Sequence, residues 1–159
     1  MQIALLTHSI NPRGGVVHVL ELGRALQARG HDVTLLAPAR PGERFFRATP
    51  CRVELAGVPA PAAGLAETVR ERIVALREHL GRLLQRGQFD VLHAHDGIGA
   101  NALADLQELG RIGGYLRTVH HYDRYADPRV QAWEDRSIRA ARRVLCVSCL
   151  LYTSPSPRD

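Results

Sequence analysis

Short apolar runs alternate with segments of helical periodicity along this chain, and this alternation limits the possible folds more than any other feature. The runs typical of buried strands are residues 2–7, 33–37, 89–94, 115–120 and 143–148. The segments with apolar residues at helical spacing are 16–29, 65–86, 98–109 and 129–141. Strand and helix in alternation predict an α/β fold with a doubly wound parallel, Rossmann-like sheet. Residues 40–63, rich in Pro, Gly and Arg, are predicted to form a long surface connection with an edge strand at 52–55.

The length of 159 residues fits one domain with a core of its own. A hydrophobic fraction of 45% and a charged fraction of 23% indicate neither disorder nor a membrane span. The first ten residues contain no Lys or Arg and only a short apolar stretch, which is unlike a secretory signal. We therefore expect a cytoplasmic protein.

The absence of lysine, the scatter of the arginines and the spacing of the cysteines argue against several functional classes. The net charge of +5 comes from arginine alone, because the sequence contains no lysine. This excludes a Schiff-base lysine and a phosphate-binding P-loop. The arginines are scattered along the chain, so a nucleic-acid partner is not expected. Cys51, Cys146 and Cys149 complete neither a disulfide framework nor a zinc motif and are interpreted as ordinary thiols.

Polar residues follow three of the predicted strands at the point where each ends. They lie at 8–15, at 95–96 and at 120–123, and the carboxyl ends of parallel strands meet at one edge, where ligands bind. Gly14 and Gly15 precede a helix, which suits a diphosphate, although a plain tight turn would use the same residues. The dinucleotide fingerprint and the acidic residue that holds a ribose are both missing, so hydride transfer is disfavoured.

Four histidines fall near this edge. His93 and His95 share one face if the strand continues through both, and His120 and His121 follow the next strand. Such a set could hold a metal, but carboxylate partners are sparse and we predict no metal site. One of the first pair is expected to be a hydrogen-bonded structural histidine, and His120 could equally be packed at a strand end. No G-x-S-x-G motif occurs, so a serine hydrolase is not expected.

Several segments, in order, resemble retaining GT-B glycosyltransferases of family 4. They are Gly14-Gly15 with Leu22 and Leu26, followed by residues 30–33, 89–95, 118–120 and 141–148. The resemblance covers residues 1–148, which we predict to be the N-terminal, acceptor-side domain of such an enzyme. The family's C-terminal domain, which supplies most nucleotide-sugar contacts, is not in this sequence, so the resemblance implies that this chain alone is inactive.

The resemblance also implies roles for individual residues. His120 would be the catalytic-site histidine that contacts the donor sugar, and Gly14 and Gly15 would approach the donor diphosphate. The acceptor pocket would comprise His8, Asn11, His95, Asp96 and His121. The co-substrate would be a nucleotide-diphosphate sugar, with transfer to an acceptor hydroxyl, retention of configuration and no metal or other cofactor.

Residues 149–159 break the pattern of the chain. Their sequence is similar to a translated sequencing adaptor, and we predict a non-native tail, with a natural Ser/Pro-rich linker as the alternative.

Two further interpretations stay open at this point. The helix at 65–86 carries Arg70, Arg77 and Arg82 opposite its apolar stripe, which favours a solvated face over a sheet but also permits peripheral contact with a membrane. The domain could also be a non-catalytic binding module, or half of a sugar-nucleotide epimerase. The coding sequence downstream distinguishes these, because a second Rossmann half with paired acidic residues favours transfer.

Overall fold

Six parallel strands form one sheet in the order β3-β2-β1-β4-β5-β6, in a computed structural model that describes residues 1–148. The strands are β1 (Gln2–Leu6), β2 (Asp32–Ala39), β3 (Arg52–Gly57), β4 (Val91–Ala94), β5 (Leu116–Val119) and β6 (Arg143–Cys146). Every neighbouring pair is parallel. The order reverses direction between β1 and β4, which is the doubly wound arrangement. The predicted fold class is confirmed.

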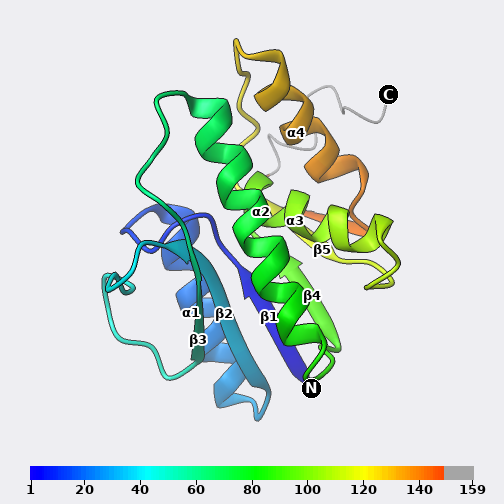
Figure 1. Cartoon of the computed structure of the whole chain (residues 1–159). Coiled ribbons are helices and arrows are strands. Elements are labelled where there is room, and N and C mark those ends of the chain that lie inside the picture. The colour runs from blue at the N-terminus through cyan, green and yellow to red at the C-terminus, as the bar shows by residue number, and fades with distance from the viewer. Residues whose placement is uncertain (149–159) are drawn as a thin grey trace.

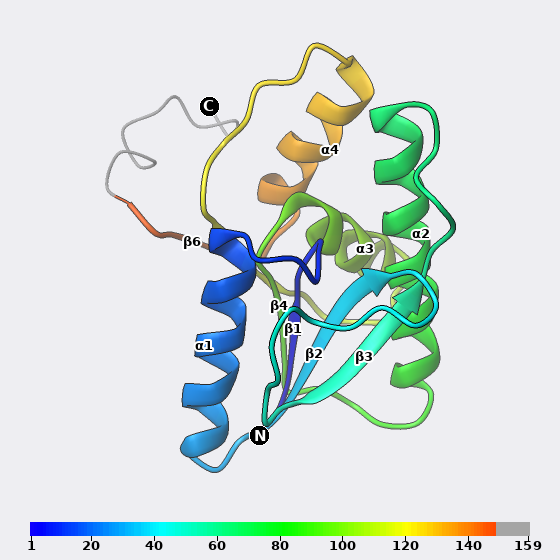
Figure 2. The same ribbon diagram turned by 90° about the vertical axis from the view of Figure 1, so that its left-hand side faces the viewer.

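Helices cover both faces of the sheet (Figures 1 and 2). The helix α1 (Gly14–Ala28) lies alone on one face, whereas α2 (Leu65–Leu84) and α3 (Gly97–Glu108) cover the other, and α4 (Pro128–Arg139) packs against α3. Consecutive side chains of β1 pack in the hydrophobic clusters on opposite faces of the sheet, because side chains alternate across a strand. Leu5 packs in the cluster of α1 and Leu6 in the cluster of α2 and α3.

The strand β2 does not stop before Pro38, as the sequence predicted, but runs to Ala39. The carbonyl of Leu36 accepts a hydrogen bond of 2.9 Å from the N–H of Thr7, so the backbone of Leu36 faces β1. Two residues later Pro38 faces the same side, where β1 has already ended at Leu6. The missing N–H of proline therefore removes no ladder bond, and the strand tolerates it.

The connection between β2 and β3 is less exposed than predicted. Phe45 and Cys51 are 7% and 6% exposed and join the cluster beneath α1. The connection from β2 to β3, all of which the structure describes, contains no helix, so these two side chains cover apolar surface that a crossover helix would otherwise bury. The edge strand itself is present and is slightly longer than expected.

The helix α1 begins at Gly14, two residues earlier than predicted, so both glycines belong to its first turn. No helix among residues 1–148 is long and apolar enough to cross a membrane. The predicted tail at 149–159 lies outside the described residues.

Candidate functional site

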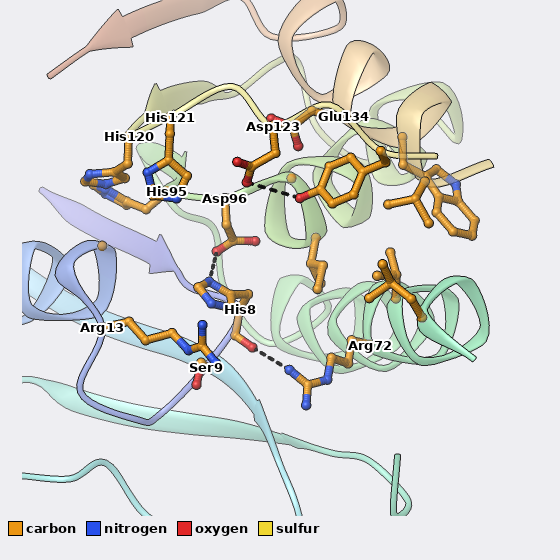
Figure 3. A pocket seen from close by; sticks show the side chains of 18 of the residues that line it. His8, Ser9, Arg13, Arg72, His95, Asp96, His120, His121, Asp123 and Glu134 are labelled. Carbon is orange, nitrogen blue, oxygen red and sulfur yellow. Dashed lines mark hydrogen bonds and ion pairs between the residues drawn. The ribbon is translucent and has the colours of Figure 1, made fainter. Parts of the chain in front are cut away.

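A cleft of about 580 Å³ opens at the carboxyl edge of the sheet. Every site residue that the sequence predicted lines this cleft: His8, Asn11, Gly14, Gly15, His95, Asp96, His120 and His121. They come from the loop after β1, the first turn of α1 and the loops after β4 and β5, and Figure 3 shows several of them facing a common space. The cleft lies where the strand order reverses, since loops on either side of that point leave the sheet in different directions.

Gly15 and His120 are neighbours in this cleft. A Cβ atom placed on Gly15 would lie 3.5 Å from Cδ2 of the His120 ring, so the glycine leaves its backbone open beside the imidazole. The preceding residue, Arg13, forms no side-chain cap, and the first turn of α1 contains no acidic residue. The positive end of the helix dipole is therefore not neutralised locally, and it can attract an anionic ligand.

Four imidazole rings gather along one side of the cleft. His95 lies 4.2 Å from His93, 5.4 Å from His18 and 5.9 Å from His120, measured between ring centroids. His93 is the hydrogen-bonded structural histidine that the sequence predicted, because its Nε2 lies 2.7 Å from Oγ1 of Thr118. Both ring nitrogens of His95, and Nε2 of His120, are buried without a hydrogen-bond partner among residues 1–148.

Burial keeps His93, His95 and His120 uncharged. Loss of contact with water, with smaller effects of the nearby His18 and Arg117, lowers the pKa of His93 to about 4. Burial and the adjacent His93 lower the pKa of His95 to about 2. The pKa of His120 falls to about 4 because of burial and the neighbouring His18. At neutral pH His93, His95 and His120 are neutral imidazoles that can both donate and accept a hydrogen bond.

Asp96 links the start of α3 to the loop after β1. Its Oδ1 accepts a hydrogen bond of 2.7 Å from the N–H of Gly99 and so caps α3, while its Oδ2 lies 3.8 Å from Nδ1 of His8. Burial alone would raise the pKa of Asp96, but His8, Arg117 and the Gly99 amide outweigh this effect and lower it. The His8 carbonyl accepts from Nη1 of Arg72 at 3.1 Å, so His8 is fixed at both ends (Figure 3).

Several polar residues at or beside the site were not predicted from the sequence, and four of them bear on its chemistry. Arg72, Arg117 and Glu134 line the cleft, and His18 adjoins it from α1. Arg117 is 3% exposed in the middle of β5, with Nη2 3.9 Å from Oε1 of Glu134. An arginine within an apolar strand is the signal that could have found this pair, because a buried charge requires a partner. His18 stands three residues after Gly15, which places both on one helix face.

This fold and its cleft define a Rossmann-like domain of the type found in GT-B glycosyltransferases. Sucrose-phosphate synthase from Thermosynechococcus elongatus superposes with a TM-score of 0.70, covering 96% of this chain and 79% of that chain at 18% identity. The model of Glycosyltransferase Family 4 matches residues 12–149, and the chain belongs to this family. MurG of Acinetobacter baumannii shares the fold at a TM-score of 0.58 and 15% identity, covering 91% of this chain and 40% of that chain.

Curated relatives are mannosyltransferases. The phosphatidyl-myo-inositol mannosyltransferase of Mycolicibacterium smegmatis is 36% identical over 116 residues, which is 71% of this chain and 28% of that protein. The protein of the same name from Mycobacterium tuberculosis is 36% identical over 100 residues, covering 60% of this chain and 25% of that protein. The chain thus spans about a quarter of the length of these relatives.

Proposed function

We propose that this chain is the acceptor-side part of a retaining glycosyltransferase that moves a sugar from a nucleotide-diphosphate sugar to an acceptor hydroxyl. The observation that supports this most directly is the contact of Gly15 with His120 at the N-terminus of α1. An exposed backbone, a positive helix end and a neutral imidazole are thereby brought within reach of one ligand. Family membership supports the reaction class.

In the proposed reaction, negative charge develops on the departing nucleotide diphosphate. Gly14 and Gly15 let that group approach the N–H groups of the first turn of α1, where the helix dipole stabilises it. His120 contacts the donor sugar as a neutral hydrogen-bonding partner. We propose that this electrostatic stabilisation supports transfer without a metal ion or another cofactor, with retention of configuration.

His8, Asn11, His95, Asp96 and His121 are proposed to form the acceptor pocket, into which the Arg72 side chain also projects. The pair formed by His8 and Asp96 presents groups that can orient a hydroxyl. Arg13 and Arg72 add positive charge at the rim and favour an anionic acceptor. The mannosyltransferases carry the name of phosphatidyl-myo-inositol, an anionic lipid, which agrees with this choice.

Ion pairs on α2 weaken the case for peripheral membrane contact through that helix. Nε of Arg70 lies 3.1 Å from Glu67, and Nη1 of Arg77 lies 3.5 Å from Asp105, so much of the basic face is already paired. Of the three arginines named from the sequence, Arg70 and Arg82 are exposed, and Arg82 lies near the end of the helix. We keep a cytoplasmic location with peripheral membrane contact as part of the proposal.

A second domain is proposed to supply most contacts with the nucleotide. This agrees with the chain covering 28% of the mannosyltransferase from Mycolicibacterium smegmatis. An epimerase is a candidate with weaker support, because UDP-GlcNAc 2-epimerase from Methanocaldococcus jannaschii shares the fold, with a TM-score of 0.58, at only 13% identity. A non-catalytic binding module is the third candidate. It differs from both enzymes in that the complete gene product would show no turnover.

The test of the proposed function is His120→Ala in the complete gene product. Loss of a group that stabilises the transition state typically lowers kcat by about 10²-fold or more. The assay measures the release of nucleoside diphosphate with a panel of donors. The rate of transfer should fall by that factor, while the urea midpoint of unfolding changes little. His31→Ala is the matched control, because His31 lies beside β2 at the opposite edge of the sheet. Equal turnover in wild type and His120→Ala would remove His120 from the mechanism.

A further inference from the structure

We propose that His18, His95 and His120 form a binding site for one divalent transition-metal ion. Each of the three side chains offers a ring nitrogen, and these ligand atoms lie within 4.8 Å of one another. The rings come from α1 and from the loops after β4 and β5, so the fold, not local sequence, brings them together.

Several nitrogens of these rings lack a hydrogen-bond partner among the described residues, which indicates that the cluster is incomplete. His95 is 4% exposed, yet neither of its nitrogens has a hydrogen-bond partner within the described residues. Nε2 of His120 is likewise buried without a partner. Buried polar atoms are nearly always satisfied by protein, water or an ion. A cation held between the rings would satisfy nitrogens of both histidines at once.

The distances fit such an ion after a small closure. Zinc–nitrogen bonds of about 2.0–2.1 Å in a tetrahedron place neighbouring nitrogens about 3.3 Å apart. The nitrogens here lie within 4.8 Å, and His18 is exposed, so rotation of that side chain can bring its nitrogen closer to the other two. His93 is occupied by its bond to Thr118 and packs against His95, where it can fix the orientation of that ring.

The chemistry of the ligands selects the ion. Three imidazoles suit zinc, cobalt, nickel or copper, whereas magnesium and calcium require oxygen ligands. The cluster contains no carboxylate. Three protein ligands leave a fourth position, open to water or to a ligand in the cleft.

The consequence for activity rests on the proposed function. His120 would contact the donor sugar during transfer, so an ion bound to His120 competes with the donor. Zinc would then inhibit the complete enzyme, and a chelator would restore it. The ion thus controls whether the donor can occupy the cleft, and it is not a cofactor of transfer.

The binding test uses the whole chain after treatment with a chelator. Titration with Co²⁺ should give the intense visible absorption of a four-coordinate site, and calorimetry with Zn²⁺ should give one equivalent bound. Loss of a ligand should weaken Zn²⁺ binding at least tenfold, since even outer partners of metal ligands contribute about 10–100-fold. His18→Ala is the informative variant because the side chain is exposed and its loss leaves the core intact. His95→Gln and His120→Gln should have the same effect, and His31→Ala should bind as wild type.

Three outcomes would overturn the inference. One is the absence of saturable Zn²⁺ binding by the wild-type chain. Another is binding that His18→Ala and His120→Gln leave unchanged. The third is near-ultraviolet thiolate-to-cobalt absorption that is lost in Cys146→Ser, which would place the ion on a cysteine. These readouts need no donor or acceptor, so failure of the proposed transferase function would leave the result on metal binding interpretable.

Discussion

Glu134 is a buried carboxyl group whose pKa is set by its surroundings in the folded chain. It lies on α4, is 8% exposed and faces Arg117 across 3.9 Å. Burial raises the pKa of Glu134 to about 7, because removal from water penalises the carboxylate more than Arg117 stabilises it. The same burial lowers the pKa of Arg117. The carboxyl group therefore changes charge close to neutral pH, inside the cleft.

This shift predicts a pH dependence of stability. The unfolded chain releases the Glu134 proton near its usual pKa of 4.5, whereas the folded chain keeps it until about 7. The folded state thus binds the extra proton between these values, and its stabilising effect is present below 4.5 and lost as the pH rises through 7. The contribution of Glu134 to the slope should reach at most about 1.4 kcal/mol per pH unit.

Urea denaturation at a series of pH values between 5 and 8 measures this contribution as the difference between the wild type and Glu134→Gln, because the amide does not titrate. The comparison is needed because the lowered pKa values of His93, His95 and His120 make stability change with pH in the opposite direction below about 6.5. Glu78→Gln, which removes an exposed carboxylate of α2, should follow the wild-type profile. A Glu134→Gln profile parallel to that of the wild type would show that another group is responsible.

The helices pack closely at only some of their glycines, and this difference defines an element-scale prediction. A Cβ on Gly99 in α3 would lie 3.0 Å from Cβ of Leu6, an atom fixed to the backbone of β1. A Cβ on Gly81 in α2 would meet only the end of Leu106, at 3.8 Å. The first position has no room for a methyl group, and the second has room.

Gly99→Ala should destabilise the chain by about 1–3 kcal/mol, because overpacking against the sheet exceeds the helix-propensity gain of at most about 1 kcal/mol. Gly81→Ala should be neutral or stabilising by up to about 1 kcal/mol, since only the propensity gain applies. The free energy of unfolding in urea measures both. A stabilised Gly99→Ala variant would mean that α3 can move away from β1 without cost.

At the scale of the molecule, the cleft is formed by one domain, and its carboxyl-edge loops face open space. In the proposed function, the chain offers the diphosphate a helix end and two glycines, and a second domain supplies most contacts with the nucleotide. We therefore predict that the chain alone binds nucleotide sugars weakly. Calorimetry with UDP-glucose and GDP-mannose should show no saturation up to about 1 mM, a binding free energy weaker than about −4 kcal/mol. Tight, stoichiometric binding would contradict the assignment of the nucleotide contacts to a second domain.

The amino-acid sequence determined the α/β class, the parallel sheet and the edge at which the site lies. Local patterns suffice for these, because apolar periodicity reports burial and parallel strands always place their carboxyl ends together. The contact of Gly15 with His120 follows the same logic. The joining of His18 to His95 and His120, the pairing of Arg117 with Glu134 and the passage of β2 through Pro38 were decided by tertiary structure alone. Each depends on which elements become neighbours in space, and neither spacing nor composition records that.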